Sequence, residues 1–444
     1  MKPYPLQQLA HAMNGSLRQG GEDFIISAGV STDTRSIATG ALFFALKGEN
    51  FDAHHFLVQA VEAGAGALVV QNDSDLPEGV PLVLVNDTLE ALQALAKWYR
   101  SKLGIPVVAI TGSNGKTSTK DLTRSVLSQR FRVNATLGNL NNHIGLPLTV
   151  LSTEADDEVG VFEMGINHSG ELAPLCEIGQ PDVSIITNIG TAHIEHLGSR
   201  EAIALEKGTV ARTLSEKGTL LVPGDCDYVE QFRASTPASV ITVGDGVIRA
   251  ENIMPGESGS SFDLVIDGLG MVRTSIAVSG RHMISNALLA AGAGFVLGLT
   301  LDEISAGLGN AELTSGRLRR YCSNEVTVID DTYNANPESV IAALETLAGL
   351  PGDGRRIAAL GMMAELGDHA AAAYPKIGRS AADLKLTLVT VGEDAKAYGA
   401  NHHFNTREEA ATWLSEETSS GDIVLFKGSR MAAMERVMKL AFPE

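Results

Sequence analysis

The stretch AITGSNGKTSTK (residues 109–120) decides the fold of the middle of the chain. It overlaps the apolar run PVVAI (residues 106–110), which predicts a buried strand, and a helix is expected from about Lys116 to Gln129. A glycine loop between a strand and a helix directs backbone N–H groups and the helix N-terminus at an anion. In the usual phosphate loop four residues separate the two glycines, whereas only two separate Gly112 from Gly115. The pattern therefore predicts a nucleotide site with a shortened loop.

Each part of this loop has an expected task. Lys116 is expected to reach the β- and γ-phosphates, and the Thr117 hydroxyl is expected to ligate Mg²⁺. The alternative is a glycine turn with a surface lysine, which the strand–loop–helix context disfavours. The loop by itself does not distinguish an ATPase, a GTPase and a ligase. The nucleotide-binding residues predicted here are Gly112, Ser113, Asn114, Gly115, Lys116, Thr117 and Ser118.

Composition narrows the class of protein. The 444 residues allow about three domains, and 34 basic against 53 acidic residues give a net charge of −19. This charge argues against a nucleic-acid or anionic-membrane partner. Three cysteines without a C-x-x-C pair favour a reducing compartment and no metal cluster. The first residues lack a signal peptide's apolar core, and no run of about 18 apolar residues predicts a membrane span. We expect a cytoplasmic protein.

Three blocks of strands and helices follow one another, with boundaries predicted at 1–85, 86–314 and 315–444. Strands alternating with helices predict an α/β fold whose central sheet is mostly parallel. Residues 239–280 are turn-rich and alternating, which predicts an antiparallel β insert in the central block. The expected strands outside this insert are GALFFALKG (40–48), GAGALVV (64–70), EVGVFEMG (158–165), VSIITNIG (183–190), GTLLVP (218–223), VTVIDD (326–331), RRIAALG (355–361), LTLVTVG (386–392) and DIVLFKG (422–428).

Polar residues follow two strands of the central block. Glu163 ends one strand, and an acidic residue beside a phosphate loop commonly holds Mg²⁺. His193, Glu195 and His196 follow the next strand at the same expected edge of the sheet. A lone histidine in a loop more often has a structural role. A functional role for His193 is favoured only by its place after a parallel strand, at the same edge of the sheet as Glu163. On sequence grounds alone, Lys207 is a solvated helix lysine.

Seven motifs occur in an order that resembles the Mur ligases of peptidoglycan synthesis, over essentially the whole chain. The resemblance is greatest to the member that adds D-alanyl-D-alanine, and the N-terminal stretch TDTRSIATGALFFALKGENFDAHHF (32–56) supports it. The motifs are TGSNGKTSTK (111–120), GNLNNHIGLPLTVL (138–151), FEMGINHSGEL (162–172), TNIGTAHIEHLGS (187–199), SGRLRR (315–320), DDTYNANPES (330–339) and FKGSRMAAME (426–435).

The resemblance implies three domains around a cleft. They are a small α/β domain for a UDP-sugar, a central ATP domain with the shortened loop, and a Rossmann-like α/β domain. It also implies a reaction: ATP phosphorylates the carboxylate of a UDP-N-acetylmuramoyl-tripeptide, and the amine of D-alanyl-D-alanine attacks the acyl phosphate. ATP and Mg²⁺ are the implied cofactors, and a monomer is expected.

The resemblance also implies roles for individual residues. Thr117 and Glu163 would hold one Mg²⁺, and His193 a second, supported by Lys207 if that lysine is carbamylated. Lys116, His193 and Lys207 are thus the implied catalytic residues. Asn286 resembles an adenine contact, Arg317 a phosphate contact and Asp331 a ribose contact. The implied substrate-binding residues are Ser31, Thr34, Arg35, Asn139, Asn142, Lys427, Ser429 and Arg430.

The chain departs from the family pattern at two places. Met283 stands where relatives carry an asparagine after His282, and Met362 stands where an aspartate is usual. Because Met362 removes a carboxylate that relatives have, the resemblance does not predict the details of the pocket for D-alanyl-D-alanine. Bland alternatives also remain: Arg35 as surface charge, NANPES (334–339) as a turn and helix cap, and Lys427 and Arg430 as a solvated loop.

Three other functions compete. A family member that adds a diamino acid would carry a DNPR motif, which is absent. A folylpolyglutamate synthetase would lack the N-terminal block seen here. A P-loop switch or motor is the alternative from another class, and it would hydrolyse nucleotide without an amino substrate. The polar motifs of the third block favour a ligase.

Overall fold

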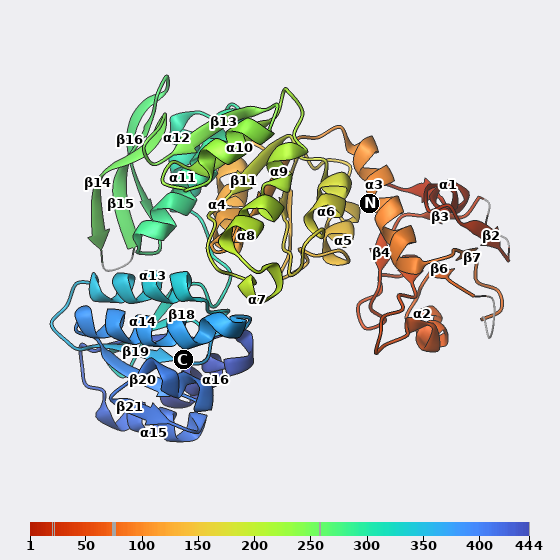
Figure 1. The fold of residues 1–444 in the computed structure, drawn as a ribbon. Helices are drawn as coiled ribbons and strands as arrows, with labels where there is room; N and C mark the ends of the chain where they lie inside the picture. Colours follow the sequence, from red (N-terminus) through yellow and green to blue (C-terminus); the bar gives the residue numbers. More distant parts are fainter. Residues whose placement is uncertain (20, 22, 73–76, 257–258, 444) are drawn as a thin grey trace.

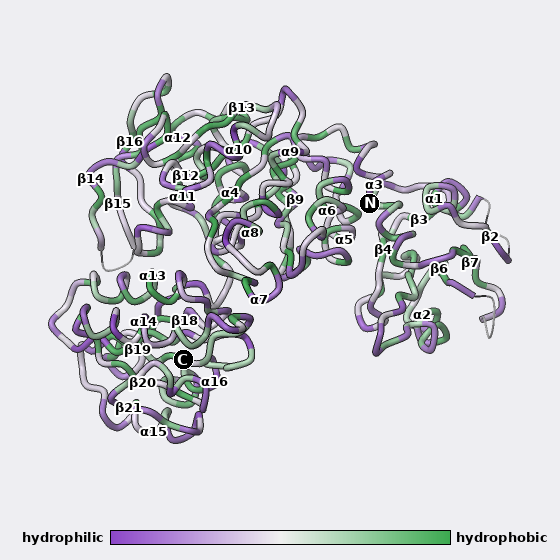
Figure 2. The backbone as a smooth tube through the Cα atoms, in the orientation of Figure 1, coloured by the Kyte–Doolittle hydropathy of each residue, from purple (hydrophilic) through white to green (hydrophobic). Residues whose placement is uncertain are grey.

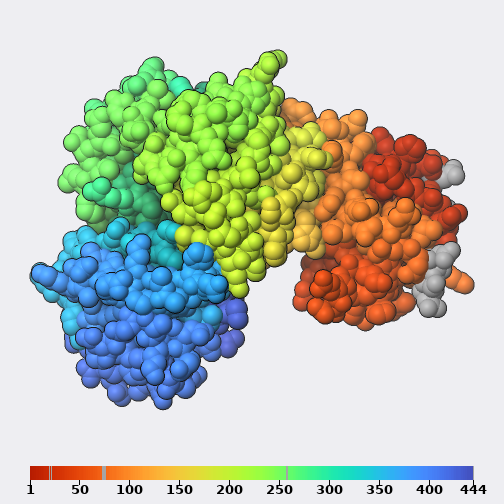
Figure 3. Space-filling model, viewed as in Figure 1, coloured from red at the N-terminus to blue at the C-terminus, as the bar shows by residue number. Residues whose placement is uncertain are grey.

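The chain folds into three α/β lobes, each built on its own sheet (Figure 1). This computed structural model describes residues 1–19, 21, 23–72, 77–256 and 259–443. The central lobe lies between the other two, and the space-filling view shows open space between the N-terminal and C-terminal lobes (Figure 3). In the described part of the chain, no helix has the length and apolar character needed to cross a membrane.

The central lobe contains the phosphate loop at the carboxyl end of a parallel strand. Its core strands are apolar along their whole length because helices cover both faces of the sheet. Alternate residues of the first strand show this, since Val108 and Ile110 enter one core and Val107 and Ala109 the other. The strand order is β16-β15-β14-β13-β12-β11-β8-β10-β9. The strands are β8 (Val107–Thr111), β9 (Val133–Ala135), β10 (Val159–Glu163), β11 (Val183–Ile186), β12 (Thr219–Pro223), β13 (Ser239–Val243), β14 (Ile248–Gly256), β15 (Gly259–Ile266) and β16 (Gly270–Ile276).

The antiparallel part of this sheet begins later than the sequence predicts. β13 pairs in parallel with β12, and only β14, β15 and β16 pair antiparallel. Most residues of β13 are partly exposed, and exposure does not specify strand direction. The predicted insert therefore extends the same sheet.

Helices of the central lobe divide between the two faces. Residues of α4, α11 and α12 pack into one core, and residues of α3, α5, α6, α8 and α9 pack into the other. The helices are α3 (Thr88–Leu103), α4 (Lys116–Leu127), α5 (Gly145–Leu151), α6 (Leu172–Gly179), α7 (Ile194–Leu197), α8 (Arg200–Lys207), α9 (Thr209–Arg212), α10 (Val229–Ser235), α11 (Arg281–Val296) and α12 (Leu301–Gly309).

The N-terminal lobe joins the central lobe through helix α3. Asp87 caps this helix by accepting hydrogen bonds from the N–H groups of Leu89 and Glu90, and Gly104 ends it in a left-handed conformation. One hydrophobic core runs from the N-terminal lobe through α3 to α5 and α6. The elements are β1 (Tyr4–Pro5), α1 (Leu6–Ala12), β2 (Ser16–Arg18), β3 (Ile25–Ile26), β4 (Val30–Ser31), β5 (Leu42–Phe44), η1 (Ala53–Phe56), α2 (Leu57–Glu62), β6 (Ala67–Val70) and β7 (Leu82–Leu84).

The C-terminal lobe is a second doubly covered sheet, with order β17-β18-β22-β19-β20-β21. Hydrophobic residues concentrate along its strands and hydrophilic residues along its outer loops (Figure 2). The edge strand β17, which the sequence analysis did not predict, pairs antiparallel with β18. The elements are β17 (Arg319–Ser323), β18 (Val326–Asp331), α13 (Pro337–Ala348), β19 (Arg356–Leu360), η2 (Gly367–His369), α14 (Ala370–Asp383), β20 (Thr387–Val391), η3 (Glu393–Tyr398), β21 (His402–Phe404), α15 (Arg407–Glu417), β22 (Ile423–Lys427), η4 (Arg430–Ala432) and α16 (Met434–Ala441).

Candidate active site

A cavity of about 1280 Å³ lies between the central and C-terminal lobes. Its central wall is formed by the phosphate loop and by the segments that follow β10 and β11. Its C-terminal wall is formed by the ends of β18 and β22 and the loop after β19. Carboxyl ends of parallel strands from two separate sheets thus meet at one site, the usual place for ligands in such folds.

The two glycines of the phosphate loop are required by its geometry. Gly112 has φ +147° and Gly115 has φ +79°, both disfavoured for residues with a side chain. A Cβ on Gly112 would lie 1.8 Å from the Thr187 hydroxyl, and a Cβ on Gly115 would lie 2.7 Å from Oδ1 of Asn286. The loop is also fixed from the side, since Ser113 and Asn114 donate their N–H groups to Asn188.

We expect Gly112→Ala to weaken ADP binding by at least about tenfold, because its Cβ displaces the loop from the Thr187 hydroxyl. Isothermal titration calorimetry with ADP and Mg²⁺ measures this loss. Gly170→Ala is a matched control, since Gly170 also has positive φ but no atom lies within 4 Å of its added Cβ. Equal ADP affinities of Gly112→Ala and the native protein would contradict this account of the loop.

Helix α4 begins at the loop and carries Lys116 and Thr117 into the cavity. Lys116 Nζ donates to the Gly112 carbonyl at 2.8 Å, which folds this side chain over the loop. Burial lowers the pKa of Lys116, and the nearby Glu163 partly opposes that change. Arg317 donates to the Thr117 hydroxyl at 3.2 Å and lies 4.0 Å from the centre of the Tyr333 ring. The predicted phosphate contacts Lys116 and Arg317 and the predicted Mg²⁺ ligand Thr117 therefore lie together.

Glu163 is buried beside the phosphate loop, at the end of β10. Its Oε1 accepts a hydrogen bond from Asn141 Nδ2 at 2.8 Å, and its Oε2 is buried without a hydrogen-bond partner in the described structure. An unpaired buried carboxylate oxygen is costly unless a cation or donor satisfies it. Glu163 therefore has the free ligand atom that a cation would need.

Sequence reasoning missed Asn141 and selected its neighbours Asn139 and Asn142. All three line the cavity. Asn142 Oδ1 accepts hydrogen bonds from the N–H groups of Ile144 and Gly145, in the turn that precedes helix α5. The motif GNLNNHIG offered all three asparagines without a periodicity that distinguishes them.

Lys207 is fully buried at the end of α8, and its Nζ has no hydrogen-bond partner among the described residues. The interpretation of Lys207 as a solvated helix lysine is therefore wrong. Burial lowers the pKa of Lys207 well below its usual value, and the nearby Lys116 lowers it further. A neutral buried amine is the form that can react with carbon dioxide, which fits the implied carbamylation.

His193 pairs across the cavity with Glu365, a residue that sequence reasoning missed. Nδ1 of His193 lies 2.6 Å from Oε2 of Glu365, within ion-pair distance, although not aligned as a hydrogen bond. Both residues have left-handed backbones, with φ +63° and +60°. His193 lowers the pKa of Glu365. Backbone strain at two facing residues is typical of functional sites. The segment LGMMAELG (360–367) has no local pattern that marks Glu365.

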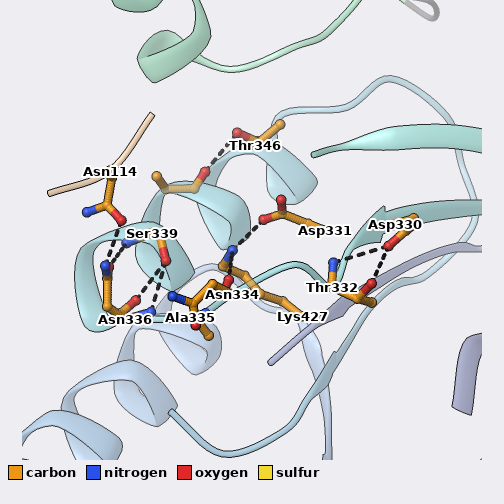
Figure 4. A network of polar contacts seen from close by, with 11 residues as sticks. Asn114, Asp330, Asp331, Thr332, Asn334, Ala335, Asn336, Ser339, Thr346 and Lys427 are labelled. Atoms are coloured by element: carbon orange, nitrogen blue, oxygen red, sulfur yellow. Dashed lines mark hydrogen bonds and ion pairs between the residues drawn. The ribbon is translucent and has the colours of Figure 1, made fainter. Parts of the chain in front are cut away.

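The C-terminal wall carries an ordered polar network (Figure 4). Lys427 Nζ donates to Asp331 Oδ2 at 2.6 Å and to the Asn334 carbonyl at 3.0 Å. Asn336 Nδ2 donates to Oδ1 of Asn114 at 2.6 Å, which links this wall to the phosphate loop. The predicted ribose contact Asp331 is thus already oriented by Lys427.

Lys427 is the last residue of β22 and is buried, so the alternative interpretation of Lys427 as part of a solvated loop is wrong. Ser429 is also buried, whereas Arg430 is mostly exposed and pairs with Glu435 at 3.4 Å. All three residues of this motif line the cavity.

Asn286 and His282 line the cavity from α11. Asn286 is buried against Gly115, and its amide donates weakly to Met283 Sδ at 3.6 Å. Burial lowers the pKa of His282 to about 4, against an opposing contribution from Asp331. At the position where relatives carry an asparagine, this chain thus places the thioether of Met283 against the Asn286 amide.

Ser31, Thr34 and Arg35 lie in the N-terminal lobe and do not line this cavity. The Arg35 side chain is exposed and pairs with Asp33 at 2.6 Å. Ser31 also bonds Asp33, through its hydroxyl and the Asp33 N–H group. The structure thus separates these predicted substrate residues from the phosphate loop.

The donor set around the loop fits magnesium. In the described ranges, no cluster of three or more His, Cys, Asp or Glu side chains is placed to hold a metal ion by itself. Magnesium, however, commonly uses one or two protein oxygens together with substrate phosphates and water. The Thr117 hydroxyl and the unpaired Oε2 of Glu163 are such oxygens. His193 lines the cavity, whereas Lys207 is fully buried and is not among the residues that line it.

Comparison with known proteins places all three lobes of the chain in one family. Three family models match: the Mur ligase family catalytic domain at residues 27–100, the Mur ligase middle domain at 110–294, and the Mur ligase glutamate ligase domain at 316–430. This chain is 36% identical to the UDP-N-acetylmuramoyl-tripeptide–D-alanyl-D-alanine ligase of Bacillus subtilis and 37% identical to that of Escherichia coli. Each alignment covers 98% of this chain and 97% of the relative.

Solved structures agree. MurF from Acinetobacter baumannii superposes with a TM-score of 0.93 at 33% identity, over 100% of both chains. MurF from Thermotoga maritima in complex with ADP has a TM-score of 0.85 at 26% identity, covering 94% of this chain and 97% of that one. With relatives of this identity aligned over nearly its whole length, the chain belongs to the Mur ligase family.

Proposed function

We propose that the protein is an ATP-dependent amide ligase that joins D-alanyl-D-alanine to UDP-N-acetylmuramoyl-tripeptide. The products would be ADP, phosphate and UDP-N-acetylmuramoyl-pentapeptide, a precursor of peptidoglycan. The observation that carries the proposal is the cavity in which a phosphate loop and Glu163, whose Oε2 has no hydrogen-bond partner in the described structure, face the polar groups of a second lobe. Relatives that carry this activity in their names align over nearly the whole chain.

The residues of the cavity divide the work. Lys116, Arg317 and the N–H groups that open α4 would hold the phosphates of ATP, while Asn286 and Asp331 would hold its nucleoside. Thr117 and Glu163 would hold one Mg²⁺, and His193 with carbamylated Lys207 a second. Bound Mg²⁺ would offset the repulsion between the anionic carboxylate and the γ-phosphate. The lobes would exclude water from the acyl phosphate as they close.

The UDP-sugar would bind away from the reacting carboxylate. Ser31, Thr34 and Arg35 would hold its nucleotide end in the N-terminal lobe, and Asn139 and Asn142 would lie along the path to the cavity. An extended substrate fits the separation of these two groups. Lys427, Ser429 and Arg430 would contribute from the C-terminal wall. The lobe boundaries 1–85, 86–314 and 315–444, a cytoplasmic location and a monomeric state stay predictions.

The decisive experiment is phosphate release from ATP and Mg²⁺ in the presence of UDP-N-acetylmuramoyl-tripeptide, with and without D-alanyl-D-alanine. We expect release that requires both substrates and is matched by a pentapeptide product in mass spectrometry. Release that is indifferent to both would reject the ligase and favour the P-loop switch or ATPase. Release with a diamino acid instead of the dipeptide would favour another member of the family.

A further inference from the structure

Two side chains at the start of helix α13 contact the central lobe. Asn336 precedes the helix and donates from Nδ2 to Oδ1 of Asn114 in the phosphate loop, at 2.6 Å. Glu338 lies in the first turn and accepts hydrogen bonds from the N–H and the hydroxyl of Thr191, at 3.1 and 2.9 Å. All four residues line the cavity. The C-terminal lobe therefore contacts the phosphate loop and the segment that follows β11 at the same time.

The phosphate loop and the segment after β11 are also hydrogen-bonded to each other. Ser113 donates its N–H to the Asn188 carbonyl at 3.0 Å, and its hydroxyl accepts from the N–H of Gly190 at 2.9 Å. The N–H of Asn114 donates to Oδ1 of Asn188 at 2.9 Å. A Cβ on Gly190 would lie 3.1 Å from Cδ of Glu338, so a glycine leaves room for this approach. The contacts thus form a closed ring through the loop, the segment after β11 and α13.

The amide of Asn336 has two tasks that fix its orientation. Its Oδ1 accepts from the N–H of Ser339 at 3.0 Å, and its own N–H donates to the Ser339 hydroxyl, so both residues form a capping box. Because Oδ1 is engaged by the cap, Nδ2 faces Asn114 (Figure 4). The helix therefore holds in place the group that bridges the two lobes, which is the preorganisation that a positioning residue needs.

The bridge gives the phosphate loop a support from the other lobe. The apparent affinity for a nucleotide depends on how often the loop has the conformation that binds it. We propose that Asn336 is a positioning residue that acts through Asn114 on the phosphate loop, so that docking of the C-terminal lobe sets the affinity for the nucleotide. By linkage, a nucleotide on the loop stabilises that docking in return. The inference rests on the proposed function for the identity of the ligand, ATP or ADP with Mg²⁺.

The test replaces Asn336 with serine. Serine caps a helix about as well as asparagine does, but its hydroxyl is too short to reach Asn114. Asn336→Ser therefore removes the bridge and keeps the cap. We expect calorimetry with ADP and Mg²⁺ to show an affinity lowered by about threefold to tenfold, the size of one hydrogen bond between uncharged groups. Equal ADP affinities of this variant and the native protein would overturn the inference.

A double-mutant cycle shows whether Asn336 acts through Asn114. Asn114→Ala removes the side chain but keeps the backbone hydrogen bonds to Thr187 and Asn188. We expect Asn114→Ala to lower the ADP affinity by at least the same factor, and Asn336→Ser to lower it by less than about a further twofold in that background. Full and independent losses from the two changes would mean that Asn336 acts by another route and would overturn the inference.

Thr406→Ala is the matched control for loss of a helix cap. Thr406 caps α15 in the same lobe through a capping box and is not among the residues that line the cavity. We expect this variant to have a lower melting temperature and an unchanged ADP affinity, whereas Asn336→Ser should show the reverse. An equal fall of ADP affinity in both variants would trace the loss to general damage of the lobe and overturn the inference.

Hydrogen–deuterium exchange separates this inference from the proposed function. Without nucleotide, the backbone amides of residues 112–116 should exchange faster in Asn336→Ser and in Asn114→Ala than in the native protein, and no faster in the double variant. A native protein that bound no ADP would reject the proposed function, and the exchange comparison would still decide whether Asn336 holds the loop. Native exchange rates in Asn336→Ser would overturn the inference.

Discussion

Replacing Lys207 with alanine is expected to lower ligation by about a hundredfold to a thousandfold, the size seen when one preorganised electrostatic group is removed from an active site. The cause is the loss of the carbamate that this lysine would provide to a cation. Its buried Nζ, its lowered pKa and its lack of a partner make the amine reactive. Short-chain carboxylates such as acetate fit the space left by the side chain and should restore part of the activity.

Folding controls distinguish this explanation from general damage. Lys207→Met keeps the volume of the side chain, so we expect it to be inactive, not rescued by acetate, and at least as thermally stable as the native protein. Lys217→Ala, at an exposed position nearby in the sequence, should keep full activity. Full activity of Lys207→Ala would remove Lys207 from the site, and mass spectrometry of the native protein should show an added carbon dioxide at this residue.

Glu163→Gln is expected to raise the Mg²⁺ concentration needed for half-maximal ligation by at least about a hundredfold. The glutamine keeps an oxygen for the Asn141 hydrogen bond, so the loop should stay in place. It replaces the unpaired Oε2 by an uncharged amide nitrogen, which is a hydrogen-bond donor and cannot ligate a cation. Titration of Mg²⁺ in the ligation assay and calorimetry of ADP with and without Mg²⁺ measure the effect.

The matched control is Glu216→Gln, which removes an exposed carboxylate of the same lobe. Nucleotide binding without Mg²⁺ should be equal in the native protein and in Glu163→Gln. An unchanged Mg²⁺ requirement in Glu163→Gln would mean that the cation binds elsewhere in the cavity.

Local patterns predicted most of the central lobe. The apolar run before Gly112 and the polar helix after it formed β8 and α4 within two residues of expectation. Parallel strands buried on both faces leave continuous apolar runs, so β10, β11 and β12 were also recognisable. The direction of β13 was not, because pairing direction depends on where the chain returns, which local alternation does not encode.

Site residues were predictable where a strand end or a motif marked them. Glu163 and His193 follow strands and do reach one cavity. Only the structure singles out Lys207, because it shows that the side chain is fully buried. The sequence of its helix predicts an amphipathic helix with solvated lysines. The importance of Glu365 comes from its contact with His193 of another lobe. The two residues are 172 positions apart in the sequence (365 − 193), and no local periodicity predicts such a contact.

The linker between the central and C-terminal lobes runs through the nucleotide site. Arg317 lies between Gly316 and Leu318, which have φ +76° and +57°, and its guanidinium rests on the Thr117 hydroxyl. A cation on that hydroxyl and the guanidinium repel each other, so loading the site would detach the arginine from the helix that anchors it. The segment that joins the two lobes therefore contacts the hydroxyl that is proposed to bind the first cation, and we expect occupancy of that site and orientation of the C-terminal lobe to be coupled.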